Sequence, residues 1–515
     1  MPTNTSLNDQ EVGWFQNYNI IKLNIILLLS MISSYATGFD GSMMNGLQSL
    51  ETWQKFFSYP HPSTLGLLNV IQNVGQLVAL PFCAVACDHF GRRVTLVGGA
   101  LLISVGVALQ GGAQNIGMFI AAQGLLGFGL AFNITAAPLL IPESAHNSHR
   151  APLVSIYNSL YSTGAVAAAW ITFGTFRMAN DWAWRTPSIL QACSSLLQVL
   201  LCYCIEESPR WLVAKGNTSK AREFITKYHA AGNSEYLTVS LELAEIREAL
   251  RLEAEAAKST SFLSFFNTKG NRHRFFIILA VGFFSQWSGN GLISYYLSLI
   301  LNSIGYESEA TQTLLNALLQ IWSLFWGVLF ALLVDRFGRR LLFLTSTIGI
   351  LAVYIVWTAL EATYERRTDL NGQGSRGVAK GVLAMIFLYN FFFSIGWGPL
   401  QVTYVVEILP FNLRARGLVL YNFFVALALI FNQYVNPVGV ENSKWKFYIT
   451  YDVWIFIELV IIFFLFVETG GKTLEETAAL LDGEEAAGKL EEDAKQAAKE
   501  IAVHIGDEKG NDTHV

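Results

Sequence analysis

The sequence predicts an all-α protein that crosses a membrane many times, and three observations support this fold class. Hydrophobic residues make up 52% of the chain and charged residues 14%, whereas a soluble domain carries about 25% charge. About twelve apolar runs are long enough to cross a bilayer, because a span needs about 20 residues. Basic residues gather in alternate loops, as in multi-pass proteins.

The apolar runs must be helices, because hydrocarbon cannot satisfy bare backbone N–H and C=O groups. They fall into two groups of six, separated by one long polar segment. We expect spans at residues 22–45, 64–87, 93–112, 115–140, 151–175, 185–205, 274–303, 311–334, 341–362, 379–406, 415–437 and 447–467.

The charges in the loops predict the orientation of the chain. The polar segment between the halves is rich in Lys and Arg, which places it in the cytoplasm together with both termini. Within it, LELAEIREALRLEAEAAK predicts short amphipathic helices. The outer loop 363–378 is an exception, since it also carries three arginines. The expected layout is a cytoplasmic segment at 1–21, a six-helix bundle at 22–205, a cytoplasmic loop at 206–273, a second bundle at 274–467 and a cytoplasmic tail at 468–515.

Composition and motifs argue against several other classes of protein. The net charge of −5 does not suggest a nucleic-acid partner. The five cysteines lie in or beside apolar runs, without a nearby His to complete a zinc set. The sequence offers neither a phosphate-binding loop nor a nucleophile triad, so we expect no enzyme activity, metal or cofactor. The lipid bilayer is the expected surrounding, and the oligomeric state stays open.

Three motifs occur once in each half. DHFGRR at 88–93 returns as DRFGRR at 335–340, IPES with Glu143 returns as VVEILP with Glu407, and EESPRW with Glu207 returns as ETGGKT with Glu468. An even number of spans in each half keeps both halves in the same orientation. Such a parallel repeat is typical of major-facilitator transporters, which bind substrate between the halves near the bilayer midplane.

The charged residues of these motifs predict a gate at the cytoplasmic edge. Glu143 with Arg150, and Glu407 with Arg414, supply further charges at this edge. We expect such groups to tie the bundles together in one conformation and to release them in another. The alternative is that these charges only fix the topology. The expected gating residues are Asp88, Arg92, Glu143, Arg150, Glu207, Arg210, Asp335, Arg339, Glu407, Arg414 and Glu468.

As a set, the motifs resemble the sugar porter family of the major facilitator superfamily. The resemblance is carried by FDGSMMNG, DHFGRR, LLGFG, WAWRTPS, EESPRW, QWSGNGLISYY, DRFGRR, GWGPLQVTYVVEILPFNLRARG and ETGGKTLEE. Within the family the chain looks most like the fungal lactose-permease and cellodextrin-transporter branch. This resemblance implies a plasma-membrane carrier that moves a disaccharide, or a hexose, by alternating access.

Sugars are held by polar side chains and a flat aromatic face. The resemblance implies that Gln286 is the principal binding residue and that Trp397 stacks on the sugar, although each could instead be structural. Family members carry a second glutamine where this chain has Ser285, and their asparagine lies one place after Asn290. The expected substrate-binding residues are Gln286, Asn290, Tyr295, Tyr296, Asn158, Trp397, Gln401 and Asn432.

Smaller side chains at several family positions favour a roomier pocket, and hence a disaccharide. Asn158 stands where relatives typically have a glutamine, Ser323 where they have an asparagine, and Ala426 where many hexose carriers have a tryptophan. Asn422 and Gln433 can supply some of the missing polar contacts in the eleventh span.

Asp40 is a carboxylate inside an apolar run, which costs about 2.5–3.5 kcal/mol on insertion scales. In proton-coupled relatives this aspartate carries the proton and faces an arginine, whose place here is taken by Gln123. Without that positive charge a proton should be held more tightly. Proton symport is the expected mechanism, with facilitated diffusion and a non-transporting sugar sensor as alternatives. A second intramembrane acid, Glu458, could be a relay or a structural group.

Overall fold

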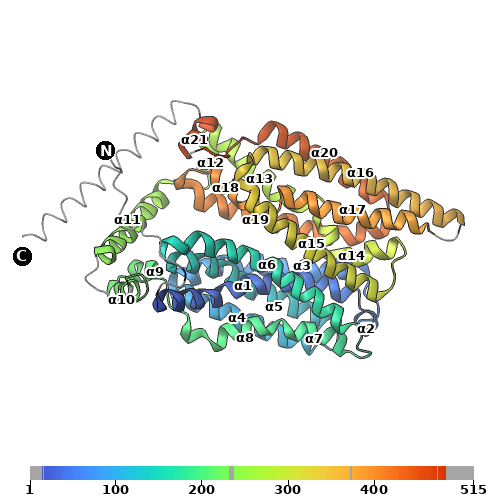
Figure 1. The fold of residues 1–515 in the computed structure, drawn as a ribbon, viewed down its shortest axis with the longest axis horizontal. Coiled ribbons are helices and arrows are strands. Elements are labelled where there is room, and N and C mark those ends of the chain that lie inside the picture. Colours follow the sequence, from blue (N-terminus) through green and yellow to red (C-terminus); the bar gives the residue numbers. More distant parts are fainter. Residues whose placement is uncertain (1–13, 15–16, 231–236, 372–373, 473, 483–515) are drawn as a thin grey trace, which may run out of the picture.

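The computed structural model describes residues 14, 17–230, 237–371, 374–472 and 474–482. Within these residues the chain forms helices and no β-strand, which confirms the all-α fold class. Figure 1 shows two helical bundles lying side by side with their long axes nearly parallel. Helices α9 to α11 lie at one end of the molecule, called here the linker end, and α2 lies at the other, called the α2 end.

The first bundle contains the helices of the N-terminal half. The sixth expected span is broken at Gln191 into two nine-residue helices. The elements are α1 Tyr18–Gln48, α2 Glu51–Phe56, α3 Pro62–Phe90, α4 Arg92–Gly111, α5 Ile116–Ser144, α6 Asn147–Thr175, α7 Trp182–Leu190, α8 Ala192–Leu200 and the 3-10 helix η1 Cys202–Cys204.

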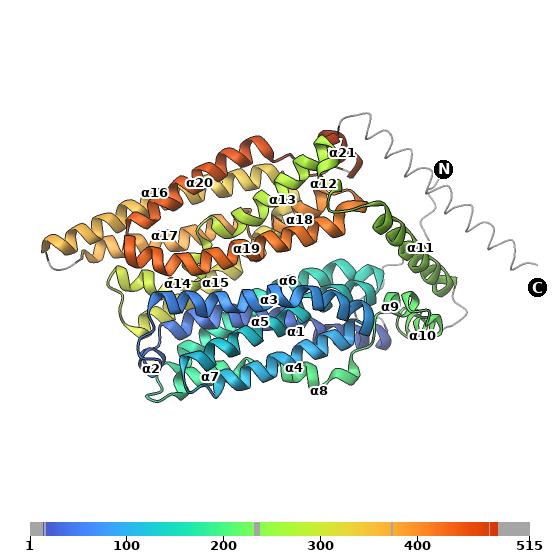
Figure 2. The same ribbon diagram turned by 180° about the vertical axis from the view of Figure 1, so that it is seen from behind.

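The linker and the second bundle follow. Helix α11 runs from the first bundle toward the second across the linker end, as Figure 2 shows from behind. The linker elements are α9 Pro209–Ala214, α10 Thr218–Tyr228, α11 Leu237–Ser259 and α12 Ser264–Asn267. The second bundle and the start of the tail contain α13 Lys269–Trp287, α14 Asn290–Ser303, α15 Glu309–Leu333, η2 Val334–Arg336, α16 Arg339–Asn371, α17 Arg376–Ile395, α18 Leu400–Ile408, α19 Phe411–Ser443, α20 Lys446–Leu465 and α21 Leu474–Asp482.

Ten helical segments in the described chain are long and apolar enough to cross a bilayer. They match ten of the expected spans, with α13 and α14 counted as one segment and α17 and α18 as another. The remaining two expected spans are α6 and the pair α7–α8, neither of which is among the ten. The break at Gln191 leaves α7 and α8 too short to meet the length criterion singly.

The outer loop expected at 363–378 is wrong in its extent, because α16 continues to Asn371. Glu365 on this extension forms an ion pair with Lys444, at 3.0 Å, just before α20 begins. A helix end rich in Glu and Arg can leave the hydrocarbon layer and continue in water. The charged residues that looked like a loop therefore lie on a projecting helix.

Helices α1 and α6 approach each other closely because glycines face the contact. A Cβ atom on Gly38 would lie 1.8 Å from the carbonyl oxygen of Tyr161, and one on Gly164 would lie 2.1 Å from that of Tyr35. Small residues at such crossings are the usual way in which membrane helices pack. This contact fixes the middle of α1, which carries Asp40, against α6.

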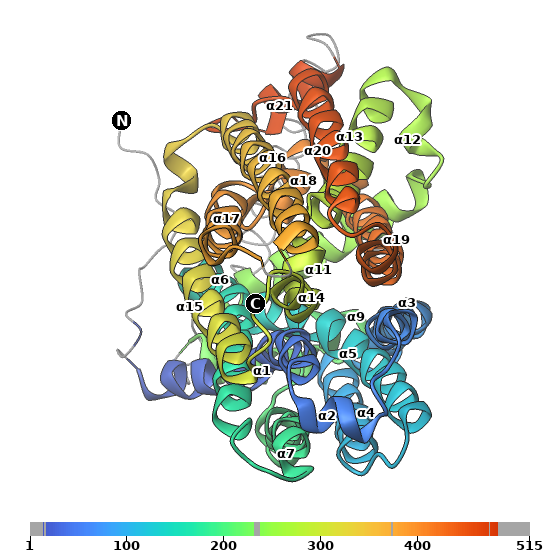
Figure 3. The ribbon, with the colours of Figure 1, turned by 90° about the vertical axis from the view of Figure 1, so that its right-hand side faces the viewer.

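Hydrogen bonds between the bundles cluster in the half nearer to the α2 end. The side chain of Asn45 on α1 donates to the carbonyl oxygen of Ile293 (3.3 Å) and accepts from the backbone N–H of Leu297 (3.2 Å), both on α14. At the extreme end, the backbone N–H of Glu51 donates to the Glu309 carboxylate. The end-on view of Figure 3 places α14 between the bundles, α3 beside α19 and α15 beside α6.

Candidate functional site

Asp40 lies on α1 about 12 Å from its α2 end, given a rise of 1.5 Å per residue. It is fully buried, and both of its carboxylate oxygens accept hydrogen bonds from amides. The Gln191 amide, at the break between α7 and α8, donates to Oδ1 at 2.6 Å, and the Gln72 amide of α3 donates to Oδ2. Three separate helices of the first bundle thus converge on this one acid.

Gln123, which takes the place of the relatives' arginine, does not contact Asp40. Its side chain is fully buried, and its amide group donates to the sulfur of Met44, at 3.1 Å. A glutamine is shorter than an arginine, and Gln72 and Gln191 take its place as donors to the carboxylate.

The residue after Gln72 crosses to the other bundle. The amide of Asn73 donates to the side-chain oxygen of Gln433 on α19, at 2.5 Å. One turn along α3, the amide of Asn69 donates to the hydroxyl of Tyr296, at 3.0 Å, and this hydroxyl donates to the backbone carbonyl of Gln433, at 2.5 Å. Neighbouring residues of α3 therefore make the two contacts: Gln72 binds Asp40, and Asn73 binds the other bundle.

Tyr296 is one of two irregular points in the seventh span. The chain breaks between α13 and α14 at Gly289, whose φ of +95° is a conformation that favours glycine. Inside α14, Tyr296 has φ −135° and ψ 27°, outside the helical region. Breaks near mid-bilayer free backbone groups and turn side chains toward the space between bundles, which is how many transporters build substrate sites.

The polar residues around this break come together as the sequence predicted, with different exposures. Gln286 and Asn290 are partly exposed, and the Asn290 side-chain oxygen has no protein hydrogen-bond partner. Asn432 is buried on α19, where its amide donates to the backbone carbonyl of Gln286 at 2.6 Å and its oxygen accepts from Asn436 at 2.6 Å. Asn432 therefore holds α13 against α19, with its polar atoms already engaged.

Trp397 lies in the core of the second bundle. It has 0% exposure, its ring packs 4.9 Å from that of Phe343, and its indole N–H donates to Thr347 Oγ1 at 3.1 Å. This conformation leaves no open face for a sugar. Gln401 follows on α18, where its amide donates to the Trp397 carbonyl (2.5 Å) and its oxygen accepts from the hydroxyl of Tyr421 (3.0 Å). Both residues brace the break between α17 and α18.

Two tyrosines face each other from opposite bundles. Tyr161 on α6 is 46% exposed, although it lies close enough to Asp40 and to Tyr295 of α14 to interact electrostatically with both. Asn158, also on α6 and exposed, lies three residues nearer to the linker end. These residues form the side of the site contributed by the first bundle.

A charged cluster at the linker end ties the first bundle together. The Arg92 guanidinium pairs with Glu143 through Nε (3.0 Å) and Nη2 (3.2 Å), and Ser208 also donates to Glu143, at 2.5 Å. The Glu207 carboxylate accepts from the backbone N–H groups of Arg92 and Arg93, the first two residues of α4. Burial raises the pKa of the Glu207 carboxyl, whereas these N–H bonds oppose the rise.

The second bundle repeats this cluster. Arg339 pairs with Glu407 through Nε (3.2 Å) and Nη2 (3.1 Å), and Thr469 donates to Glu407 at 2.5 Å. The Glu468 carboxylate accepts from the backbone N–H groups of Arg339 (2.7 Å) and Arg340 (3.1 Å), at the start of α16. An anion at a helix N-terminus satisfies donors that have no partner within the helix.

Glu143 and Glu407 bind Arg92 and Arg339 rather than Arg150 and Arg414, the arginines that follow them in the chain. Arg150 is exposed one turn into α6, and the Arg414 Nε is buried without a hydrogen-bond partner. The observed partners come from the turns between two other spans.

The remaining predicted gating residues lie around these clusters. Asp88 is 82% exposed and lies 3.8 Å from Arg92, and Arg210 of α9 forms an ion pair with Glu253 of α11. The Asp335 side chain falls outside the part of the chain that the structure describes. Both clusters join helices of one bundle, so they do not connect the bundles in this conformation.

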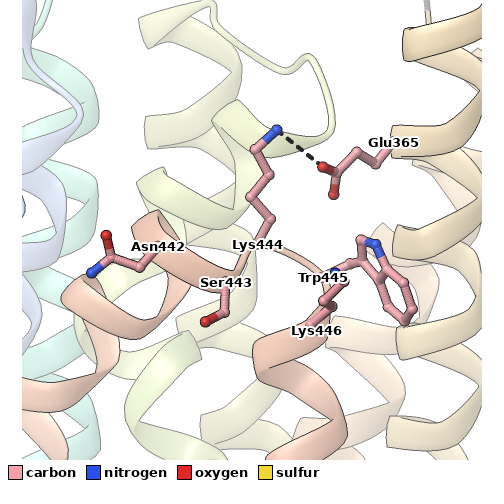
Figure 4. Close-up of a pocket in the computed structure, with 6 residues that line it drawn as sticks. All are labelled: Glu365, Asn442, Ser443, Lys444, Trp445 and Lys446. Carbon is pink, nitrogen blue, oxygen red and sulfur yellow. Dashed lines mark ion pairs between the residues drawn. The ribbon is translucent and has the colours of Figure 1, made fainter.

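A separate pocket of about 360 Å³ lies at the α2 end of the second bundle. Figure 4 shows its lining residues, with Lys444 reaching toward Glu365 and Trp445 beside them. It is remote from Asp40 and Gln286 and lies between the projecting end of α16 and the start of α20.

Sequence reasoning missed Gln72, Gln191, Asn73, Asn69 and Tyr161. Each is a polar residue within an apolar run, which is the signal that marked Asp40 as functional. The signal identifies candidates but not their partners, because the partners come from α3, α6 and α7, which are far apart in the sequence.

Comparison with known proteins agrees with this architecture. The sequence model of the family described as "Sugar (and other) transporter" matches residues 26–481. The high-affinity glucose transporter of Candida albicans is 27% identical over 89% of this chain and 85% of its own length. The MFS-type transporter criB of Aspergillus cristatus is 26% identical over 88% of this chain and 92% of its own length.

Among solved structures, the fold is similar to that of the xylose transporter XylE from E. coli in an inward open conformation. The TM-score is 0.73 at 21% identity, covering 89% of this chain and 100% of that one. XylE bound to 6-bromo-6-deoxy-D-glucose, described as a proton:xylose symporter, gives a TM-score of 0.68 at 22% identity. These neighbours share the major-facilitator fold. Because the family model covers most of the chain, this multi-pass membrane protein belongs to the sugar (and other) transporter family, as a sugar porter of the major facilitator superfamily.

Proposed function

We propose that the protein is a proton-coupled sugar carrier of the plasma membrane that works by alternating access. Its substrate is a disaccharide such as lactose or cellobiose, or a hexose. The linker end is cytoplasmic, because residues 206–273 are rich in Lys and Arg, and both termini lie on that side. The bundles at 22–205 and 274–467 are the moving bodies, and 206–273 connects them.

The conformation is inward-facing in this proposal. Contacts of Asn45, Asn69 and Asn73 close the α2 end, whereas the charged clusters at the linker end stay within their own bundles. Opening to the outside requires these asparagine bonds to break. The clusters then keep each bundle rigid while it rocks, and their exposed members, among them Asp88 and Arg150, can meet the opposite bundle.

The observation that carries the coupling is the sequence Gln72–Asn73 on α3. Gln72 donates to Asp40, and Asn73 donates across the interface to Gln433. Both Asp40 oxygens act as acceptors, as in the ionised acid; on protonation one oxygen becomes a donor and faces an amide N–H. Gln72 must then rearrange, and this motion acts on the neighbouring Asn73 contact. The bundle interface thereby responds to the proton.

The sugar binds between Gln286, Asn290 and Tyr295 of the second bundle and Asn158 and Tyr161 of the first. The Gln286 side chain is partly exposed and can meet sugar hydroxyls, whereas the Asn290 oxygen is buried without a partner in this conformation and becomes available when the site opens. Side chains that already have hydrogen-bond partners support the pocket without binding sugar. Asn432 fixes the Gln286 backbone, and Tyr296 closes the interface between the bundles. Trp397 and Gln401 brace the tenth span.

The test is sugar uptake in a transporter-deficient host supplied with lactose, cellobiose, maltose or glucose. We expect uptake of at least one of these sugars against its gradient, and loss of accumulation when an uncoupler removes the proton gradient. Gln286→Ala should raise KM for that sugar about tenfold, since one lost hydrogen bond to a polar substrate is worth about 1.4 kcal/mol.

Each alternative gives a different result in these experiments. Facilitated diffusion, which the absence of a span-four arginine at Gln123 would favour, equilibrates the sugar and ignores the uncoupler. A sensor binds sugar without counterflow in vesicles. An uptake unchanged by Gln286→Ala would contradict the proposed pocket.

A further inference from the structure

Glu458 is a second buried acid, in the middle of α20 and about 18 Å from its start at the α2 end. It has 0% exposure, and neither carboxylate oxygen accepts a hydrogen bond of normal geometry. Its polar neighbours are Tyr389 of α17 and two residues of its own helix. Trp454 lies one turn, and Tyr451 two turns, nearer to the α2 end of α20. A charge buried among such neutral groups is strongly disfavoured, which makes this acid a place where a proton can be held.

The described residues next to these neighbours come from three other helices packed against α20. Ser288, at the break after α13, lies beside Tyr389. Tyr354 of α16 and the α19 residues Asn432 and Asn436 lie around Tyr451, two turns from Glu458. The Tyr389 hydroxyl, the Ser288 hydroxyl and the Trp454 N–H are all buried without a hydrogen-bond partner of normal geometry. Polar atoms left unpaired in this way are usually satisfied by ordered water.

This polar region is bonded directly to the sugar site. The Tyr451 hydroxyl lies 2.5 Å from Asn436 Oδ1 and 3.0 Å from Asn432 Oδ1, and Asn432 holds the Gln286 carbonyl. The Tyr354 hydroxyl donates to the carbonyl of Gly289, at 2.9 Å, at the break between α13 and α14. A movement of Tyr451 would therefore act on Asn432, which positions Gln286.

The same region continues toward the α2 end. Tyr448 and Tyr451 lie on the buried face of α20, and Asp452 follows at its margin. Opposite them on α16, Glu361 accepts from Ser303 at 2.6 Å, while its other oxygen is unpartnered. One turn further, Glu365 reaches the pocket of Figure 4. Carboxyl and tyrosine groups thus run from that pocket to Glu458.

We propose that Glu458 is a second proton-binding site of the carrier, linked to sugar binding through Tyr451 and Asn432. The proton comes from water at the α2 end and forms an O–H bond on a Glu458 oxygen. That bond breaks when α13 and α14 move apart at Gly289, and the proton passes by Ser288 to water between the bundles. One positive charge moves with it, and nothing is oxidised or reduced. The inference rests on the proposed sugar transport but not on Asp40.

The first experiment compares wild type with Glu458→Gln in proteoliposomes, using radiolabelled cellobiose and glucose. Glutamine copies the shape of the protonated acid but cannot release a proton. We expect counterflow within about twofold of wild type, together with a loss of about tenfold in accumulation driven by an imposed pH gradient. Glu441→Gln removes an exposed carboxylate of α19 at the α2 end, 3.4 Å from His61, and serves as the matched control, with wild-type behaviour expected.

A Glu458→Gln protein that equals wild type in both assays would overturn the proposal and leave a purely structural acid. So would a folded variant that binds sugar without counterflow, because the proton-loaded form must exchange. A wild type that accumulates no sugar under a pH gradient would instead contradict the proposed proton coupling as a whole, so the two failures are distinguishable.

The second experiment does not depend on whether Glu458→Gln folds. Purified Asp40→Asn protein in weakly buffered detergent receives cellobiose or glucose while a pH dye records protons. We expect a sugar-dependent proton signal in Asp40→Asn, and its loss in Asp40→Asn with Glu458→Gln. Absence of the signal in sugar-binding Asp40→Asn protein contradicts a second site.

Discussion

The two bundles are alike at the linker end and different in the middle. Arg92, Glu143 and Glu207 in the first bundle correspond to Arg339, Glu407 and Glu468 in the second, with the same donors and acceptors. Their mid-membrane acids have no such correspondence. Asp40 is bound by two glutamine amides, whereas both Glu458 oxygens lack a normal hydrogen bond.

This contrast separates what the repeat preserves from what each half adds. A rigid connection between a turn and two helix ends is needed in both bundles, and the same charges supply it twice. Coupling needs an acid that responds to conformation, and the two halves place one in unlike surroundings. Polar groups inside a membrane are costly, so an acid kept there without a structural partner is a candidate for function.

The largest expected effect separates the two acids. Asp40→Asn removes the proton site of the first bundle while the amide still fits between Gln72 and Gln191. We expect loss of most pH-driven sugar accumulation, on the order of tenfold or more, with counterflow retained. Vesicle uptake with and without an imposed pH gradient measures it. If this variant still accumulated sugar, proton coupling would depend on the second bundle and not on Asp40.

The next effect compares the two charged clusters. Arg92→Ala and Arg339→Ala each leave a glutamate without its cation, which costs about 1–3 kcal/mol for a buried acceptor. The Glu143 side chain is 11% exposed and that of Glu407 is 24% exposed, so Arg92→Ala should destabilise more. Thermal unfolding in detergent tests the order, and Arg92→Ala with Glu143→Ala should recover part of the loss. Equal melting temperatures would show that exposure does not govern these pairs.

A smaller difference is expected between the glycines of the repeated motif. A Cβ on Gly91 would lie 2.3 Å from a Glu207 oxygen, and one on Gly338 would lie 2.4 Å from a Glu468 oxygen. Only Gly91 of the two has a φ, +99°, that L side chains rarely adopt. Gly91→Ala should therefore destabilise by about 1 kcal/mol more than Gly338→Ala. Melting temperatures of the two variants give the comparison, and the reverse order would contradict it.

The smallest effect concerns a contact that only the first bundle has. Burial, with neighbouring His229 and His149, lowers the pKa of His146 to about 4. The unfolded chain binds this proton near pH 6.5, so the stability due to neutral His146 is present above that pH and is lost toward pH 4. His146→Gln should weaken the fall in melting temperature on acidification. The control is His89→Gln, which replaces an exposed histidine. If the melting temperature falls equally with pH in both variants, the assignment to His146 is contradicted.

Much of the architecture could be predicted from the sequence because it follows from local chemistry. Apolar runs, loop charges and repeated motifs indicated the two-bundle arrangement and all ten of the spans that the described structure confirms. The site was harder to predict. Gln286 and Asn432 do come together, but Trp397 is buried, and Gln123 contacts Met44 and not Asp40. A pattern along the chain gives the residue type and helix face, whereas a contact depends on which helix lies opposite.

By itself, the sequence determined that the chain must be a bundle of membrane helices with two related halves, since hydrocarbon admits no other arrangement of such runs. It also located the acids, because a charged residue within an apolar run is visible without a structure. Only the tertiary structure decided that Gln72 and Gln191 bind Asp40, that Asn73 joins it to the other bundle, and that Glu458 has no such amide partners. These facts depend on close approaches between helices that are distant in sequence, which interhelical packing sets and no local pattern encodes.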